Sequence, residues 1–283
     1  MRVSFNKFLT PVKEVWKRAR KHRIDDLAAI ISYYALWASV PLAGFILYVA
    51  TYFIGSSEKI INDLNIFSQE FFSTINPRFF MNMKIYASKI KEVGIVGIYL
   101  AIVLGIMLVS KIITSIQIIY EKENNKSFFW KRLWEMAILI GSGFFLFVSF
   151  GLMAGIATFN RFVMTNSSIS SYVNPMVLWA IRSFLTKILV PFLLATFYFF
   201  ALYKWIPEKP VKVSAALKGA LLAAVGWIAG THVFMWYISN ISLAGKLFGT
   251  LSTVIIFIFW VEISSIILLI GAEVSAYLSE EKK

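Results

Sequence analysis

The sequence predicts an all-α, polytopic membrane protein. Of its 283 residues, 59% are hydrophobic and only 15% are charged, whereas about 25% of the residues in soluble domains are charged. A soluble fold of this length has too little interior to bury that much apolar surface, so the chain needs lipid as its solvent. A backbone in lipid must satisfy its own hydrogen bonds, and no alternating ten-residue pattern indicates a barrel. We therefore expect helices.

Six stretches are long enough to cross a hydrocarbon core about 30 Å thick, which takes about 20 apolar residues. They are Ile30–Ile54, Val93–Tyr120, Met136–Phe159, Val177–Tyr203, Ala215–Ile238 and Phe248–Tyr277. The segments on the side of the two termini carry 18 Lys and Arg residues, and the opposite segments carry 7. Because basic loops stay on the cytoplasmic side, we expect both termini in the cytoplasm.

Residues 1–24 predict an interfacial, basic amphipathic helix in front of the transmembrane domain, residues 25–283. Apolar side chains recur every three or four residues, and basic side chains occupy the rest of the helical wheel. Such a helix lies in the membrane interface and attracts anionic lipid. A basic tail that only sets the topology is an alternative compatible with the first. The residues expected at the lipid interface are Phe5, Phe8, Trp16, Lys13, Lys17, Arg18 and Arg20.

The loop of residues 56–92 predicts a small helical cap on the outer side. It is too long to be structureless. Apolar residues between Ile60 and Ile75 mark one face of a helix that Pro77 ends. A second helix, Arg78–Lys91, would lead directly into the second span.

Charged side chains inside the spans are costly and are therefore functional candidates. From the outer side, Lys187 lies roughly 15 Å deep and Glu262 about 21 Å deep, both near the middle of the core. Our hypothesis is that they face the interior and pair or share a polar cavity, with a purely structural ion pair as the equal alternative. Glu273 follows Glu262 on nearly the same face, and Lys111 in the second span is its candidate partner. A side chain of Lys187 or Glu262 facing lipid would refute the shared cavity.

The first span carries polar and helix-bending residues within its apolar run. Pro41 cannot donate to the carbonyl of Trp37, so we expect a kink in the middle of the membrane. Tyr33 and Tyr34 lie at the depth of interfacial aromatic anchors. Neighbouring side chains on a helix point about 100° apart, so one of the two tyrosines should face the protein interior. Both join the candidate cavity residues.

Several classes of function are excluded by what the chain lacks. Without cysteine it can form neither a disulfide nor a thiolate metal site. Its two histidines, His22 and His232, fall on opposite sides of the predicted membrane, so we expect no metal site. No G-x-x-x-x-G-K-[ST] loop is present to bind ATP. The short basic loops offer no platform for RNA, so the net charge of +13 reflects topology. We expect no catalytic residues, no cofactor and no nucleic-acid partner.

The motifs resemble those of the YihY/BrkB family of bacterial inner-membrane proteins, historically labelled ribonuclease BN. "LAAIISYYALWASVPLAG" (Leu27–Gly44) is similar to the family's first span, and "FWVEISSIILLIGAEVSA" (Phe259–Ala276) is similar to its last. Matches also occur at Ser110–Arg132, Leu202–Gly230, Tyr237–Asn240 and Phe248–Ile255.

The resemblance covers nearly the whole chain and implies six transmembrane helices in a bacterial cytoplasmic (inner) membrane. Glu273 falls in the family's Gly-Ala-Glu motif, whereas Ala38 stands where a serine is usual and Glu262 where an aromatic is usual. The ribonuclease label does not fit these residues. RNA hydrolysis needs a metal cluster or an acid–base pair beside a groove for the strand, and the chain has neither.

We therefore expect a protein that handles or transports a lipid or another amphiphile across or within the membrane, without its own ATPase. The kinked first helix, the buried charges and the outer cap would frame a cavity. The expected partners are membrane lipids. The alternative is a non-transporting scaffold that docks proteins of an envelope complex through the amino-terminal helix and the cap. The oligomeric state is left open by the sequence.

Overall fold

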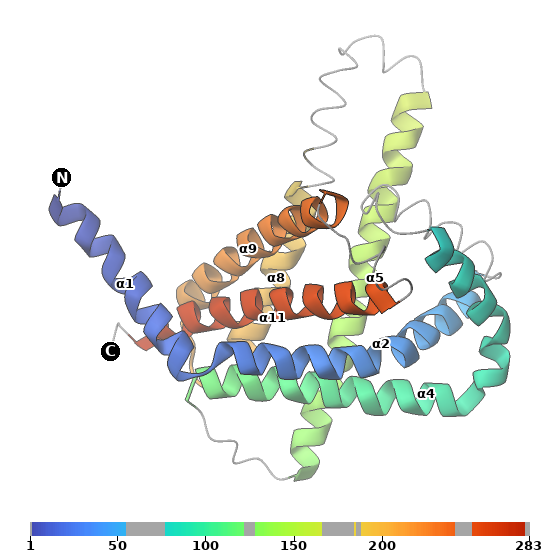
Figure 1. Ribbon diagram of the computed structural model, residues 1–283, viewed down its shortest axis with the longest axis horizontal. Helices are drawn as coiled ribbons and strands as arrows, with labels where there is room; N and C mark the ends of the chain where they lie inside the picture. Colours follow the sequence, from blue (N-terminus) through green and yellow to red (C-terminus); the bar gives the residue numbers. More distant parts are fainter. Residues whose placement is uncertain are drawn as a thin grey trace. The chain divides into compact units, whose positions relative to one another are not determined.

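The computed structural model describes residues 2–54, 77–121, 128–165, 184, 188–240 and 251–280, and in this part of the chain it contains long helices and no strand (Figure 1). The predicted all-α class is confirmed for this part. The helices are α1 (Arg2–Lys21), α2 (Ile24–Ile54), α4 (Pro77–Ile119), α5 (Phe128–Thr165), α8 (Val190–Trp205), α9 (Val213–Asn240) and α11 (Leu251–Glu280).

The chain divides into two compact units that are described separately. The first unit comprises Met1–His22, Ile116–Ala229 and Ile267–Lys283, and the second comprises Arg23–Ser115 and Gly230–Ile266. The first unit therefore holds α1, α5, α8, most of α9 and the end of α11. The second unit holds α2, nearly all of α4, the end of α9 and the start of α11.

Four helices of the described part are long and apolar enough to cross a membrane. These segments are Gly97–Ile119, Phe129–Ser149, Val213–Ile238 and Val254–Glu280, and they match the second, third, fifth and sixth predicted spans. The first predicted span lies within α2. Only Val190–Trp205 of the fourth is a described helix, and it is shorter. The total of six spans stays a prediction.

Two of the helices begin earlier than the predicted spans that they contain. The helix of the third span begins at Phe128, so Lys131 and Arg132 belong to its first turns rather than to a basic loop. The helix of the second span begins at Pro77, so the predicted outer helix Arg78–Lys91 does continue into the span without a break. The rest of the predicted outer cap lies outside the described residues.

In the first unit, α9 and α11 approach each other through small residues. A Cβ atom placed on Gly219 would lie 2.5 Å from the carbonyl oxygen of Gly271, so no larger residue fits there. Ala216, Ala220 and Ala223 follow the same side of α9 and are buried. Small residues let helix backbones come close in membranes, where packing rather than water drives association.

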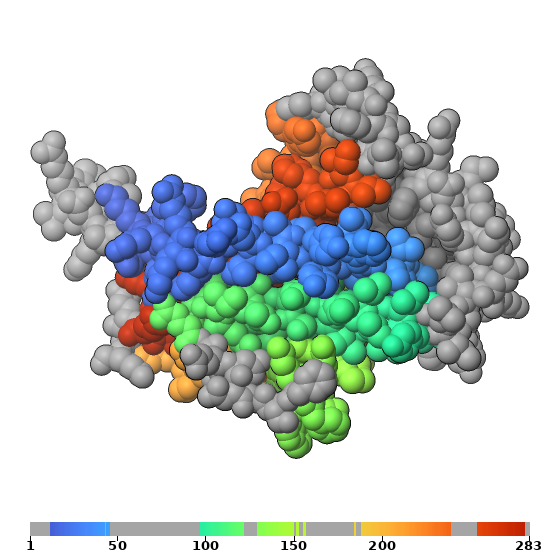
Figure 2. All heavy atoms as spheres, turned by 60° about the horizontal axis from the view of Figure 1, so that its bottom comes forward, coloured from blue at the N-terminus to red at the C-terminus, as the bar shows by residue number. Residues whose placement is uncertain are grey.

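In the second unit, α2 lies along α4, as Figures 1 and 2 both show. The buried residues of α2 are Ala28, Ile31, Ala35 and Ala38, spaced three to four residues apart so that they form one stripe. Pro41 lies inside α2, which continues through it to Ile54. In Figure 1 the axis of α2 changes direction along its length, as a proline kink predicts.

Candidate functional site

The first unit contains a fully buried carboxylate at the end of α11. Glu273 has no exposed surface, and its two oxygens are bonded to Arg18 of α1 and to His22, which directly follows α1. Arg18 Nε donates to Oε1 at 2.9 Å. Nδ1 of His22 lies 2.8 Å from Oε2. A buried carboxylate stays ionised only with such partners, since desolvation otherwise favours its neutral form.

The spacing of residues along α1 explains how it supplies these two groups. Arg18 and His22 are four residues apart, so they lie on one face of the helix, together with half-buried Val15 and Ala19. Lys17, on another face, is exposed. This face presents Arg18 and His22 to the buried carboxylate, while Lys13, Lys17 and Arg20 are exposed.

A second set of ion pairs surrounds this centre. Nη1 of Arg18 lies 2.7 Å from Glu280 Oε2. Lys21 Nζ lies 2.6 Å from Oε1 of Glu121, the second residue after the end of α4, and His22 Nε2 lies 3.5 Å from the same oxygen. We call Arg18, Lys21, His22, Glu121, Glu273 and Glu280 the α1 cluster.

The ion pairs of the α1 cluster shift the pKa of Arg18 and the pKa of Glu121. Burial acts to lower the pKa of Arg18, but Glu280 and Glu273 outweigh it, so the pKa is raised. The hydrogen bond from Lys21 and its positive charge lower the pKa of Glu121. Both shifts favour the charged forms, so the cluster holds α1 by ion pairs at neutral pH.

A neutral hydrogen-bond network lies beside the cluster. The hydroxyl of Tyr120 donates to Ser275 Oγ at 2.7 Å, and the hydroxyl of Tyr203 donates to the carbonyl of Leu268 at 2.7 Å. Lys209 Nζ donates to the carbonyl of Tyr120 and thereby ties the segment between α8 and α9 to the end of α4. The two tyrosine hydroxyls thus join α11 to the end of α4 and to α8.

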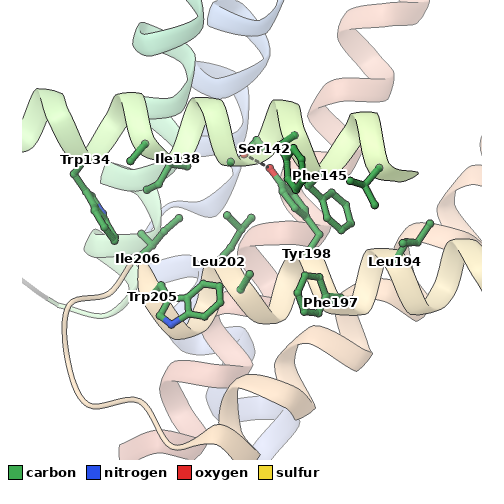
Figure 3. Close-up of a pocket in the computed structure, with 15 residues that line it drawn as sticks. Trp134, Ile138, Ser142, Phe145, Leu194, Phe197, Tyr198, Leu202, Trp205 and Ile206 are labelled. Carbon is green, nitrogen blue, oxygen red and sulfur yellow. Dashed lines mark hydrogen bonds between the residues drawn. The ribbon is translucent and has the colours of Figure 1, made fainter. Parts of the chain in front are cut away.

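A separate apolar groove runs between α5 and α8 in the first unit (Figure 3). Its volume is about 500 Å³, within the range of small-molecule sites. Phe145 stacks on both Phe197 and Tyr198. The polar contact inside it joins Ser142 Oγ and the Tyr198 hydroxyl at 3.2 Å. The remaining lining residues are Trp134, Ala137, Ile138, Gly141, Phe144, Val148, Leu194, Ala201, Leu202, Trp205 and Ile206.

The groove has two different ends. Trp134 of α5 lies at one end with Trp205 of α8 and Ile206, which follows it, while Phe145 and Leu194 lie toward the other end (Figure 3). Tryptophan is enriched where membrane meets water, and Lys131 precedes Trp134 by about one helical turn. The groove is therefore apolar along its length and has a basic, aromatic end.

The structure distributes the predicted charged residues among different places. Glu273 is the centre of the α1 cluster, whereas Glu262 is half-buried on α11 in the second unit. Lys187 lies outside the described residues. The ammonium of Lys111 sits over the ring of Tyr34, 5.0 Å from its centroid. Within its own unit, the partners of Glu273 are Arg18 and His22, and Lys111, its predicted partner, belongs to the second unit.

Tyr33 and Tyr34 lie in different environments, as their 100° separation predicts. Tyr33 is 57% exposed, and Tyr34 is half-buried beneath Lys111. A cation over an aromatic ring keeps a favourable contact without a carboxylate. The contact between Tyr34 and Lys111 therefore gives each of these two side chains a favourable partner.

Of the predicted interfacial residues, Arg18 has a different role. It pairs with Glu273 and Glu280, and only 15% of its side chain is exposed. Trp16, Lys13, Lys17 and Arg20 are exposed, and Arg20 lies over the ring of Trp16. The side chains of Phe5 and Phe8 lie outside the described part.

Sequence reasoning missed His22, Glu121, Tyr120 and the whole groove. The signal for His22 was its spacing of four from Arg18 on a helix predicted to be amphipathic. Neither an interfacial helix nor a topology-setting basic tail, the two interpretations of residues 1–24, gives His22 a partner within the protein. Glu135 is a second fully buried carboxylate, with Arg132 as its partner at 2.7 Å, and it too was not singled out. No short motif marks the groove, since it is formed by two distant segments.

Comparison with known proteins identifies the family. The family model described as "Virulence factor BrkB" matches residues 15–283. The chain belongs to the BrkB family. A UPF0761 membrane protein of Haemophilus influenzae (strain 86-028NP) is 26% identical over 271 residues, which cover 94% of this chain and 93% of that protein. No solved structure matches the chain.

Other relatives show the same extent of similarity. A UPF0761 membrane protein of Aggregatibacter aphrophilus is 27% identical over 94% of this chain and 90% of its own. One from Psychromonas ingrahamii is 25% identical over 94% of this chain and 86% of its own. BrkB-family membership over this length establishes a membrane protein, in agreement with the apolar helices. All residues of the α1 cluster fall inside the matched segment.

Proposed function

We propose that this BrkB-family protein binds a membrane amphiphile by one acyl chain in the groove between α5 and α8, and handles or moves it within the inner membrane without an ATPase of its own. The observation that carries the proposal is the groove itself. It is lined almost entirely by apolar and aromatic side chains and belongs to an apolar, membrane-spanning helix and its neighbour.

The dimensions of the groove suit an acyl chain. From Trp134 to Val148, α5 rises about 21 Å, which exceeds the roughly 15 Å depth of one leaflet. A chain lying along the groove would replace lipid contacts by contacts with rings, at little cost in desolvation. The hydroxyls of Ser142 and Tyr198 satisfy each other, so they present no unpaired polar group to the chain.

The basic, aromatic end supplies the polarity for a headgroup. Trp134 and Trp205 would lie at the membrane interface, and Lys131 would attract a phosphate. We place this end on the cytoplasmic side, because Lys131 belongs to the side that carries both termini and 18 of the basic residues. The six-span topology with both termini in the cytoplasm is part of the proposal.

Filling the groove tests the proposal. A Cβ atom on Gly141 meets no atom within 4 Å, and Gly141 lines the groove. Gly143 is equally open on the same helix but does not line it. In membranes containing a phospholipid with a photoactivatable acyl chain, we expect cross-links on α5 and α8 that Gly141→Leu abolishes and Gly143→Leu preserves.

A transport readout accompanies the binding readout. In liposomes with a fluorescent phospholipid, the parent protein should speed the exchange of lipid between leaflets, and Gly141→Leu should reduce that rate at least tenfold. Equal cross-linking in both leucine variants would contradict the proposed groove. Cross-linking without any exchange of lipid would leave a lipid-binding protein that does not transport.

The alternative function is a scaffold for envelope proteins. The observation that favours it is the surface of α5 beside the groove, where Ile140 and Phe147 are each at least two-thirds exposed. Polar substitutions of Ile140 and Phe147, which do not line the groove, would then remove function while lipid cross-linking persists.

A further inference from the structure

The basic residues of α1 divide into two groups with different surroundings. Arg18 pairs with Glu273 and Glu280, and Lys21 pairs with Glu121. Three others, Lys13, Lys17 and Arg20, are exposed, and no ion pair within the described part of the chain involves them. The positive charge of these three residues is therefore not neutralised by the protein.

The three unneutralised cations share one side of α1. Successive residues of a helix turn by about 100°, so Lys13, Lys17 and Arg20 fall within one narrow sector. This sector lies on the side of the helix away from Arg18 and half-buried Val15. The contacts of Arg18 with α11 fix the rotation of α1 about its axis. The helix thus presents a basic side away from the buried carboxylate.

An exposed tryptophan lies beside the cations. The side chain of Trp16 is 58% exposed, and the guanidinium of Arg20 lies over its ring, 5.3 Å from the ring centroid. Tryptophan together with lysine and arginine is typical of helices that lie against lipid headgroups. We call Lys13, Trp16, Lys17 and Arg20 the basic face of α1.

The ion pairs of Arg18 bring the basic face to the end of a membrane-spanning helix. Glu280, one partner of Arg18, is the last residue of the apolar segment Val254–Glu280. Along the axis of α1, Lys17 and Arg20 lie within about 3 Å of Arg18, and Lys13 within about 8 Å. The attraction between exposed charges acts over about 8–10 Å at physiological salt. All three cations are therefore within range of headgroups at that end of the helix.

We propose that the basic face of α1 binds the phosphate groups of anionic phospholipids in the leaflet on the side of the termini. The face supplies positive charge and a headgroup-level aromatic ring, and the ligand supplies the negative charge that the protein lacks there. This site is different from the groove between α5 and α8, which would take an acyl chain. It collects anionic lipid beside the first unit whether or not the groove is occupied.

The test measures which lipid gathers beside α1 in the full-length protein. The chain contains no cysteine, so Val12→Cys places a single donor dye at an exposed position of α1. The vesicles consist of phosphatidylcholine with a trace of acceptor lipid. The acceptor is phosphatidylglycerol or phosphatidylcholine, each with the same dye on an acyl chain. Energy transfer then gives the local concentration of each lipid near the basic face.

In the parent, the local concentration of phosphatidylglycerol should be about fivefold that of phosphatidylcholine or more, and high salt should reduce this enrichment. Joint substitution of Lys13, Lys17 and Arg20 by glutamine should abolish it, and Lys17→Gln alone should lower it. Lys218→Gln removes an exposed cation from α9 of the same unit and should leave it unchanged. The joint variant with Lys13→Arg, Lys17→Arg and Arg20→Lys keeps the charges and should keep the enrichment.

Three results would overturn the proposal. The first is equal transfer to both lipids in the parent, and an acidic protein segment would then be the occupant to test for this face. The second is enrichment that survives in the triple glutamine variant. The third is an equal loss in Lys17→Gln and Lys218→Gln, which would assign the effect to net charge. Circular dichroism and the charge-preserving variant show whether substitutions on this face permit folding. Gly141→Leu fills the groove and should leave the enrichment unchanged, so the proposed function is tested separately.

Discussion

At the residue scale, Glu273 is the most consequential side chain of the described part. Its carboxylate is fully buried and neutralises Arg18 beside His22. A buried ion pair need not stabilise a protein more than a well-packed apolar pair would. Removing one partner is nevertheless costly, because the other charge stays buried and unpaired.

We therefore predict that Glu273→Gln lowers the free energy of unfolding by about 3 kcal/mol. Titration with a denaturing detergent, followed by circular dichroism, measures the change. Glu262→Gln is the matched control, since it makes the same substitution on the same helix at a half-buried position outside the α1 cluster. If both variants lower the free energy of unfolding equally, the ion pairs of Glu273 do not add to its contribution.

The tyrosine network gives a smaller effect. Tyr120→Phe removes the donor to Ser275 Oγ, and we expect a loss of about 1 kcal/mol. Tyr33→Phe changes a hydroxyl on a side chain that is 57% exposed and should be neutral. Thermal unfolding of both variants in the same detergent compares them, and an equal midpoint would argue against the network.

At the scale of the elements, the close approach of α9 and α11 decides how the first unit packs. The neighbours of Gly219 are the carbonyl of Gly271 and the Cβ of Ser275, and neither can rotate away. Any added atom must push one helix from the other.

Gly219→Ala should therefore destabilise the protein by about 2 kcal/mol, although alanine favours the helix. Gly143→Ala meets no atom within 4 Å and should be neutral or stabilise by about 0.5–1 kcal/mol. The same detergent titration measures both. A stable Gly219→Ala variant would mean that the two helices do not touch at this point.

At the scale of the whole molecule, the charge bias predicts the orientation of the chain. The segments predicted to lie on the side of the termini carry 18 of the Lys and Arg residues, and the segments predicted on the other side carry 7. Single cysteines can be placed without removing any native one. In intact cells, an impermeant maleimide should label Ser57→Cys and spare Lys283→Cys until the inner membrane is opened. The opposite pattern would invert the topology.

In the α1 cluster, the helix could be predicted from the sequence, but the partners of its side chains could not. The periodicity of residues 1–24 predicted a helix, and the structure contains it as Arg2–Lys21. That Arg18 would pair with a glutamate 255 positions later was not predictable, because periodicity assigns a face to a helix but no partner to that face. Lys111 was chosen for Glu273 on depth alone, and depth does not fix the direction of a side chain.

The all-α class of the described part, its apolar helices and the family could be predicted from the sequence, because hydrophobic length and helical period are local properties of each segment. The partners of each charge, the groove between α5 and α8 and the glycine that lies against a neighbouring backbone could not be predicted in this way. These features depend on the rotation and approach of helices far apart in the chain, which packing sets and local pattern does not.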